Sequence, residues 1–169
     1  AICLDRDSQE LKYEIFSRLN LGAIKLKDQE VRNCIFRGSL NTMLRRIADT
    51  DENVKVLFHH ADNKRMEFEE RILRFFAMRN FYQISGTFKD TMNRFMRRHQ
   101  NDSISEITEM ENQYRSVMDT IKQVLGEEAF LFHGERANKF NGAVYDSIVI
   151  PFSLFPKRVL LQHADEIRE

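Results

Sequence analysis

The sequence predicts a mainly α-helical fold, an irregular multi-helix bundle with one short strand at its N-terminus. The 169 residues include only 6 glycines and 2 prolines, whereas 31% are charged, and this composition favours helices over a turn-rich β-sandwich. Apolar residues also recur every three or four positions along most of the chain. Because 42% of the residues are hydrophobic, the chain can bury a core, which excludes an intrinsically disordered protein.

Charge and cysteine content narrow the class of protein. The 26 basic and 26 acidic residues cancel, so the net charge favours neither nucleic acid nor a membrane surface as a partner. An apolar run of roughly 18 residues, as a membrane span needs, is absent from the sequence. Cys3 and Cys34 are too few for a disulfide framework, which favours a cytoplasmic location. We expect no metal site, because the neighbours His59 and His60 would point about 100° apart on a helix.

The chain opens with four apolar residues that predict a short strand, residues 1–4. A lone strand cannot satisfy its own backbone groups, and no second convincing strand follows for over a hundred residues. We therefore expect a fragment whose partner strands lie upstream. The alternative is an edge strand that pairs with residues 129–132.

The next stretch predicts a series of short helices. Leu11, Ile15 and Leu19 recur every four residues on one face, and Gly22 supplies the stop. A second helix is expected over residues 28–38. Further helices follow in the sequence, one capped by Ser39 with Leu40, Met43, Leu44 and Ile47 inward, and a short one over residues 52–58.

The strongest core helix is predicted over residues 65–82, where aromatic and aliphatic side chains follow helical spacing. Oppositely charged pairs four residues apart, Glu67–Arg71 and Glu70–Arg74, should each add a few tenths of a kcal/mol. We expect Glu69 and Glu70 to form a solvated face.

A basic patch is predicted on the following helix, residues 88–99. Its members are Lys89, Arg94, Arg97 and Arg98, opposite a stripe that contains Phe88 and Phe95. Such a patch can hold the phosphates of a nucleic acid. The alternative is an ordinary solvated helix face, which the zero net charge favours.

The last third of the chain predicts a long core helix over residues 104–125, with a cap at Ser103 and a stop at Gly126. Residues 141–155 are apolar on nearly all sides, which indicates a buried helix or strand, with a kink or break at Pro151. Pro156 could start a final helix. The side chains expected in the core are Phe75, Phe76, Phe95, Met96, Tyr114 and Val117.

One candidate site follows from the end of the first predicted helix. Arg18 and Asn20 flank Leu19, so both point away from the buried stripe. A guanidinium fork and an amide at a helix end suit phosphate or carboxylate recognition. Asn is also a routine helix terminator, and that reading remains open.

Several segments together resemble conserved motifs of a known family. Residues 15–20 read Ile-Phe-Ser-Arg-Leu-Asn, and residues 26–38 read Leu-Lys-Asp-Gln-Glu-Val-Arg-Asn-Cys-Ile-Phe-Arg-Gly. Residues 39–44 continue this stretch, and residues 69–77 and 141–146 resemble two later motifs. In combination and order these segments are similar to the N-terminal family of GmrSD-type restriction endonucleases.

This resemblance implies a ParB-like α/β lobe, of which residues 1–25 would be the end, followed by a helical domain over residues 26–169. Family members hydrolyse nucleoside triphosphates with a divalent metal through an Asp-Gly-Gln-Gln-Arg motif. They act in bacterial defence, coupled to cleavage of modified DNA by a His-Asn-His nuclease domain or subunit. Neither signature occurs in this sequence. We therefore expect this chain to be inactive by itself and to hold no cofactor.

The resemblance also assigns candidate nucleotide-site residues. Arg18 and Asn20 fall on the family's site-lining motif, and Arg32 and Asn33 would buttress it from behind. Two other interpretations stay open. The chain could be a helical module that binds DNA or a protein through Arg94, Arg97 and Arg98, or a homodimerisation bundle built on residues 104–125.

Overall fold

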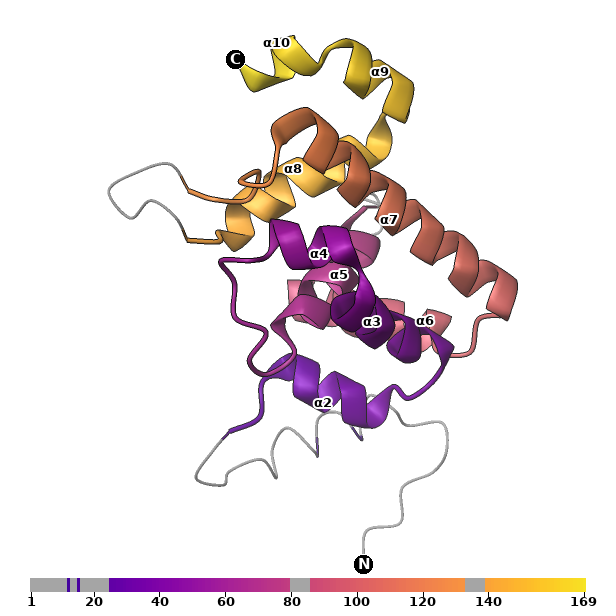
Figure 1. Cartoon of the computed structure of the whole chain (residues 1–169). Helices are drawn as coiled ribbons and strands as arrows, with labels where there is room; N and C mark the ends of the chain where they lie inside the picture. The colour runs from indigo at the N-terminus through magenta and orange to yellow at the C-terminus, as the bar shows by residue number, and fades with distance from the viewer. Residues whose placement is uncertain (1–11, 13–14, 16–24, 80–85, 133–138) are drawn as a thin grey trace, which may run out of the picture.

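The computed structural model describes residues 12, 15, 25–79, 86–132 and 139–169, and this part of the chain is mainly helical (Figure 1). It holds nine helices and, within these ranges, no sheet. The predicted mainly α fold is therefore confirmed. The predicted strand at residues 1–4 lies outside the described residues, as do Arg18 and Asn20.

The helices follow one another with short connections. Their bounds are α2 Asp28–Ile35, α3 Ser39–Thr50, α4 Glu52–Leu57, α5 Glu67–Met78, α6 Phe88–His99, α7 Ile104–Leu125, α8 Gly142–Leu154, α9 Lys157–Gln162 and α10 Ala164–Arg168. Between α7 and α8, Leu131 forms one antiparallel bridge with Phe140. Figure 1 shows α2 at one end of the molecule, α9 and α10 at the other, and α3 to α8 between them.

Local chemistry sets several helix ends where the sequence predicts them. Ser103 and Glu106 form a capping box at the start of α7, and Gly126 ends that helix with a φ of 83°. The start of α3 differs from the prediction. Gly38 is the N-cap, because a Cβ at residue 38 would lie 2.0 Å from the carbonyl oxygen of Gln100. The Ser39 hydroxyl instead donates to the carbonyl oxygen of Asp102, at 2.8 Å.

Two further helices differ from expectation. The predicted helix over residues 65–82 begins later, at Glu67, because Arg65 and Met66 have left-handed φ values of 62° and 64°. The segment over residues 141–155 is one helix, and Pro151 lies inside α8 without breaking it. Pro156 is the N-cap of α9, as the sequence indicates.

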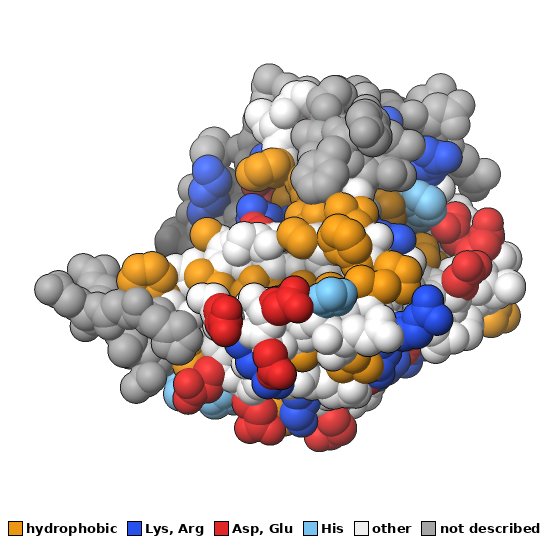
Figure 2. Space-filling view, turned by 90° about the horizontal axis from the view of Figure 1, so that it is seen from above, with side chains coloured by type: hydrophobic (Ala, Val, Ile, Leu, Met, Phe, Trp, Pro, Cys, Tyr) orange, Lys and Arg blue, Asp and Glu red, His pale blue; other side chains and the backbone are white. Residues whose placement is uncertain are grey.

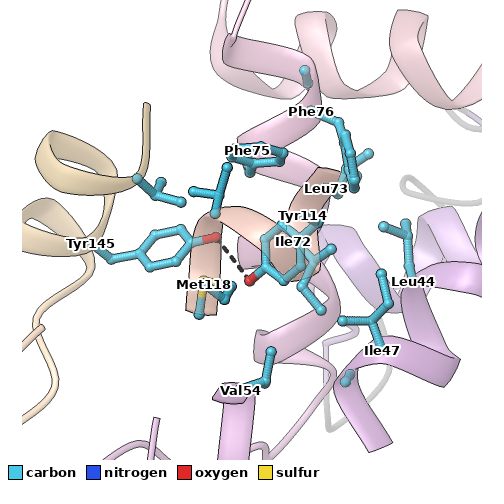
Figure 3. Close-up of a cluster of buried hydrophobic side chains, with 14 of the residues drawn as sticks. Leu44, Ile47, Val54, Ile72, Leu73, Phe75, Phe76, Tyr114, Met118 and Tyr145 are labelled. Atoms are coloured by element: carbon cyan, nitrogen blue, oxygen red, sulfur yellow. Dashed lines mark hydrogen bonds between the residues drawn. The ribbon is translucent and has the colours of Figure 1, made fainter. Parts of the chain in front are cut away.

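The core lies between α3, α5, α7 and α8 and is mostly apolar (Figure 3). Phe75 and Tyr114 are buried edge to face, with ring centroids 5.1 Å apart. The Tyr114 and Tyr145 hydroxyls lie 3.3 Å apart, and the Tyr145 hydroxyl donates to the carbonyl oxygen of Arg71 at 3.1 Å. Burial raises the pKa of both tyrosines. A donor chain therefore satisfies both buried hydroxyls.

Five of the six predicted core side chains are buried, and Phe95 is the exception. Its ring is half-buried, between the rings of Phe76 and His99. The prediction that Phe88 faces inward is wrong, because this side chain is 55% exposed. Its ring lies instead under the Arg74 guanidinium, 5.0 Å from ring centroid to Cζ.

The C-terminal helices α9 and α10 pack on α7. Figure 2 looks onto this end of the molecule, where hydrophobic side chains lie among acidic and basic ones. In the part of the chain that the structure describes, every helix is too short or too polar to cross a bilayer.

Candidate functional site

Helix α2 turns a polar face toward the rest of the protein. Gln29 and Arg32 are each only 1% exposed. The Arg32 Nε donates to Oδ1 of Asn93 on α6 at 3.0 Å, and Nη1 donates to Oε1 of Gln29 at 3.0 Å. The same Nη1 lies 3.4 Å from Oε2 of Glu70 on α5. A buried guanidinium is costly unless its donors are satisfied, so these contacts hold α2 in one orientation. We call Gln29, Arg32, Glu70 and Asn93 the α2 polar cluster.

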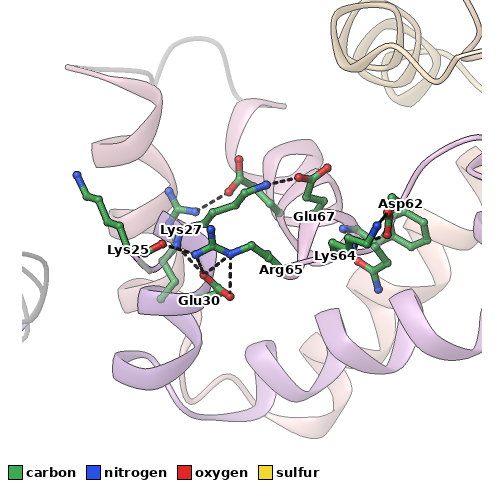
Figure 4. A network of polar contacts seen from close by, with 11 residues as sticks. Lys25, Lys27, Glu30, Asp62, Lys64, Arg65 and Glu67 are labelled. Carbon is green, nitrogen blue, oxygen red and sulfur yellow. Dashed lines mark hydrogen bonds and ion pairs between the residues drawn. The ribbon is translucent and has the colours of Figure 1, made fainter. Parts of the chain in front are cut away.

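A second group of charges ties the start of α2 to the start of α5 (Figure 4). Arg65 donates from Nε and Nη2 to Oε2 of Glu30, at 3.1 and 2.6 Å. Lys27 pairs with Glu67, and Arg65 also donates to the carbonyl oxygen of Lys25. The Arg65 fork is the main reason that the pKa of the Glu30 carboxyl lies below its ordinary value.

The backbone at Arg65 and Met66 is strained at this junction. Two consecutive non-glycine residues in the left-handed region cost on the order of 1–3 kcal/mol each. The Arg65–Glu30 pair holds the first of them, and the Asn33 amide donates to the Met66 sulfur and holds the second. Strain of this kind is concentrated at binding sites.

The ion pairs predicted within α5 do not form. Glu67 pairs with Lys27, and Glu70 with Arg32, instead of with residues four positions further along α5. Arg74 pairs with Asp146 of α8 at 2.6 Å. The prediction that Glu69 is solvated is also wrong, because it is 5% exposed, and burial raises the pKa of its carboxyl. The acidic side chains of α5 therefore join helices to one another.

These contacts bring together three segments that are far apart in the sequence. Residues 26–38 meet residues 69–77 through Arg32 and Glu70. Residues 69–77 meet residues 141–146 through the Tyr145 hydroxyl on the Arg71 carbonyl and through the Arg74–Asp146 pair. Desolvation raises the pKa of the Asp146 carboxyl, and the neighbouring Arg74 opposes this shift without cancelling it. The three segments thus form one interlocked unit.

The predicted basic patch on α6 is brought together only in part. Arg94, Arg97 and Arg98 line one hollow of about 560 Å³, which Phe95 also lines. The three arginines therefore do not lie opposite Phe95, as the spacing predicts, but around it. Lys89 is not among the lining residues, and its Nζ lies 2.9 Å from Oδ1 of Asp28.

A second hollow, of about 400 Å³, adjoins the first and shares Phe95, Arg98 and His99 with it. Burial lowers the pKa of Arg79, whose guanidinium donates to Gln113 in this second hollow. The His99 Nδ1 lies 2.6 Å from Oδ2 of Asp102. The described lining of both hollows holds no carboxylate, so the shared surface is cationic.

The structure places two of the four predicted nucleotide-site residues. Arg32 and Asn33 are both buried on α2, whereas Arg18 and Asn20 lie outside the described residues. Sequence reasoning missed Gln29 and Asn93 as partners of Arg32. The spacing of three residues between Gln29 and Arg32 is a signal for the first. Asn93 is 61 residues away from Arg32, and no local pattern reveals that contact.

Among the described residues, no group of three or more His, Cys, Asp or Glu side chains is placed to hold a metal ion. The chain matches no family model, no curated protein and no solved structure. The family resemblance therefore rests on the residues quoted for it.

Proposed function

We propose that the chain is the helical part of a nucleoside-triphosphate-hydrolysing restriction protein of the GmrSD type. The observation that supports this most is the interlocking of residues 26–38, 69–77 and 141–146. These segments carry the family resemblance, and their polar side chains contact one another instead of solvent. In the proposal, a ParB-like lobe and a His-Asn-His nuclease are partners of this chain, and the lobe supplies the nucleotide and metal chemistry.

Within the proposal, Arg18 and Asn20 hold the nucleotide or orient the catalytic loop. The α2 polar cluster and Asn33 then keep α2 at a fixed angle behind them. Only Arg32 and Asn33 of these four residues have a described environment, and both are positioning residues in this interpretation.

Phosphate release from ATP and GTP tests the proposal. The chain alone should show no turnover, because it has no Asp-Gly-Gln-Gln-Arg segment. In the longer gene product, Arg18→Ala and Asn20→Ala should each lower turnover by about a hundredfold, roughly 2.7 kcal/mol of barrier, with melting nearly unchanged. Arg158→Ala, at an exposed position of α9, is the matched control.

Two results would contradict the proposal. The first is turnover by the chain alone that survives repurification and disappears in Asn20→Ala. The second is a longer reading frame without an Asp-Gly-Gln-Gln-Arg segment. Normal turnover in both longer variants would remove the site assignment.

A second candidate function is nucleic-acid binding at the hollow of α6. The supporting observation is that Arg94, Arg97 and Arg98 line one hollow whose described lining has no carboxylate. Phosphate contacts make affinity fall steeply with salt. Arg94→Ala combined with Arg98→Ala should weaken binding to a DNA duplex and flatten its salt dependence, whereas Arg158→Ala should not. Binding that does not depend on salt would exclude this function.

A further inference from the structure

A polar groove runs between α2 and α3, on the side of α2 away from the arginine hollow of α6. Its walls are one stripe of each helix together with the residue before α5, and its volume is about 610 Å³. This is within the usual range of small-molecule sites, about 300–1,000 Å³. The lining residues that matter here are Asn33, Arg37, Asn41, Arg45 and Met66.

Two amide oxygens in this groove have no partner. Asn33 and Asn41 are 7% and 8% exposed, and among the described residues nothing donates a hydrogen bond to either Oδ1. The Asn33 nitrogen donates to the sulfur of Met66, which can accept but not donate. This contact fixes the orientation of the Asn33 amide and leaves its oxygen as the atom in need of a donor. Buried acceptors without donors are costly, so a ligand that donates two hydrogen bonds suits this position.

Two guanidinium groups lie at the rim of the same groove. Arg37 and Arg45 are exposed, on α2's C-terminal connection and on α3. Neither guanidinium makes an ion pair with a described residue, in contrast to Arg32, Arg46, Arg65, Arg74 and Arg115. Two forks from two different elements suit an anion with three oxygens better than one with two.

The remaining charge in the groove does not oppose an anion. Glu30 lines the groove, but its carboxylate already accepts from Nε and Nη2 of Arg65. Donor-seeking atoms inside and acceptor-seeking atoms at the rim therefore define a ligand with hydroxyl groups at one end and a strong anion at the other.

We propose that this groove binds a small sugar phosphate. Its hydroxyls donate to the Asn33 and Asn41 oxygens, and its phosphate accepts from Arg37 and Arg45. The inference is independent of the triphosphate hydrolysis and nucleic-acid binding proposed above, since it uses none of the residues assigned to them except Asn33.

The test is a titration of the chain with ribose 5-phosphate, followed by side-chain amide and backbone NMR shifts. Saturable shifts should centre on α2 and α3, and inorganic phosphate and ribose should each bind at least tenfold more weakly. Arg37→Gln combined with Arg45→Gln should abolish binding without unfolding the chain, because both side chains are exposed. Arg158→Gln is the matched control and should bind as wild type.

Asn41→Leu separates the two ends of the ligand. It should reduce affinity for ribose 5-phosphate to that for inorganic phosphate, and leave inorganic phosphate unchanged. Three outcomes would overturn the proposal. They are no saturable binding of ribose 5-phosphate, equal affinity for inorganic phosphate, or binding that survives the double arginine variant.

Discussion

The apolar core and the α2 polar cluster are both buried, but they are built from opposite materials. The core around Phe75, Tyr114 and Tyr145 uses aromatic rings, and its few polar atoms satisfy one another. The α2 polar cluster buries the guanidinium of Arg32 and leaves the nitrogen of Gln29 without a partner among the described residues. Apolar burial stabilises a fold directly, whereas a buried ion pair roughly offsets its own desolvation. The core therefore determines stability, and the cluster determines the orientation of α2.

The largest effect should come from the core. Phe76 is 6% exposed and contacts the rings of Phe75 and Tyr114, so Phe76→Ala should lower the free energy of unfolding by about 3–5 kcal/mol. Phe88→Ala is the matched control at a 55% exposed position and should cost less than about 1 kcal/mol. Denaturant unfolding measures both. A loss within about 0.5 kcal/mol for Phe76→Ala would mean that this face of α5 is not in the core.

A smaller effect of opposite sign is expected at Glu69, a buried carboxyl with one oxygen unpartnered among the described residues. Its folded-state pKa is raised above the ordinary value of 4.5, so its favourable contribution is complete below that value and is lost as pH rises through the folded-state pKa. Glu69→Gln should therefore stabilise the protein at pH 7, by about 1 kcal/mol.

Thermal melting at a series of pH values checks this prediction. The gain from Glu69→Gln should shrink as the pH falls toward about 4, where the wild-type carboxyl is protonated in both states. Glu109→Gln, at an exposed position of α7, is the control and should show no such trend. A Glu69→Gln variant less stable than wild type at pH 7 would show that the carboxylate has a partner.

The smallest effect separates the two buried tyrosines. Tyr145→Phe removes the donor to the Arg71 carbonyl and the acceptor for Tyr114, and should cost about 1 kcal/mol or slightly more. Tyr114→Phe leaves the Tyr145–Arg71 bond in place and should cost less. Chemical denaturation of both variants gives the order, and a larger loss for Tyr114→Phe would reverse the donor chain.

The two regions also differ in how far the sequence predicts them. Period-3.6 patterns predict α7 to its ends, because Ser103, Gly126 and the apolar stripe between them act locally. The same reasoning fails at Phe88, Glu69 and Glu70, whose positions on α5 and α6 depend on neighbours from other helices. Asn93 and Asp146 have no local signal for their partners. Long-range polar contacts are thus the part of the fold that single-sequence patterns do not reveal.

The candidate sites follow the same rule. The run of basic residues on α6 predicts a cationic surface, and Arg94, Arg97 and Arg98 do share a hollow. Their relation to Phe95 depends on the packing of α6 against α5, which the pattern did not capture. The groove between α2 and α3 is invisible in the sequence, because it depends on the angle between two helices joined by residues 36–38.

Denaturant unfolding of a fully apolar replacement tests most directly whether the α2 polar cluster determines orientation instead of stability. Arg32→Ala alone leaves Gln29 and Asn93 without their donor and should cost about 2–3 kcal/mol. The triple variant Gln29→Leu, Arg32→Met and Asn93→Leu removes all three polar groups together. Its free energy of unfolding should equal or exceed that of the wild type to within about 1 kcal/mol. A triple variant as unstable as Arg32→Ala, or less stable, would contradict this and show that the cluster itself stabilises the fold.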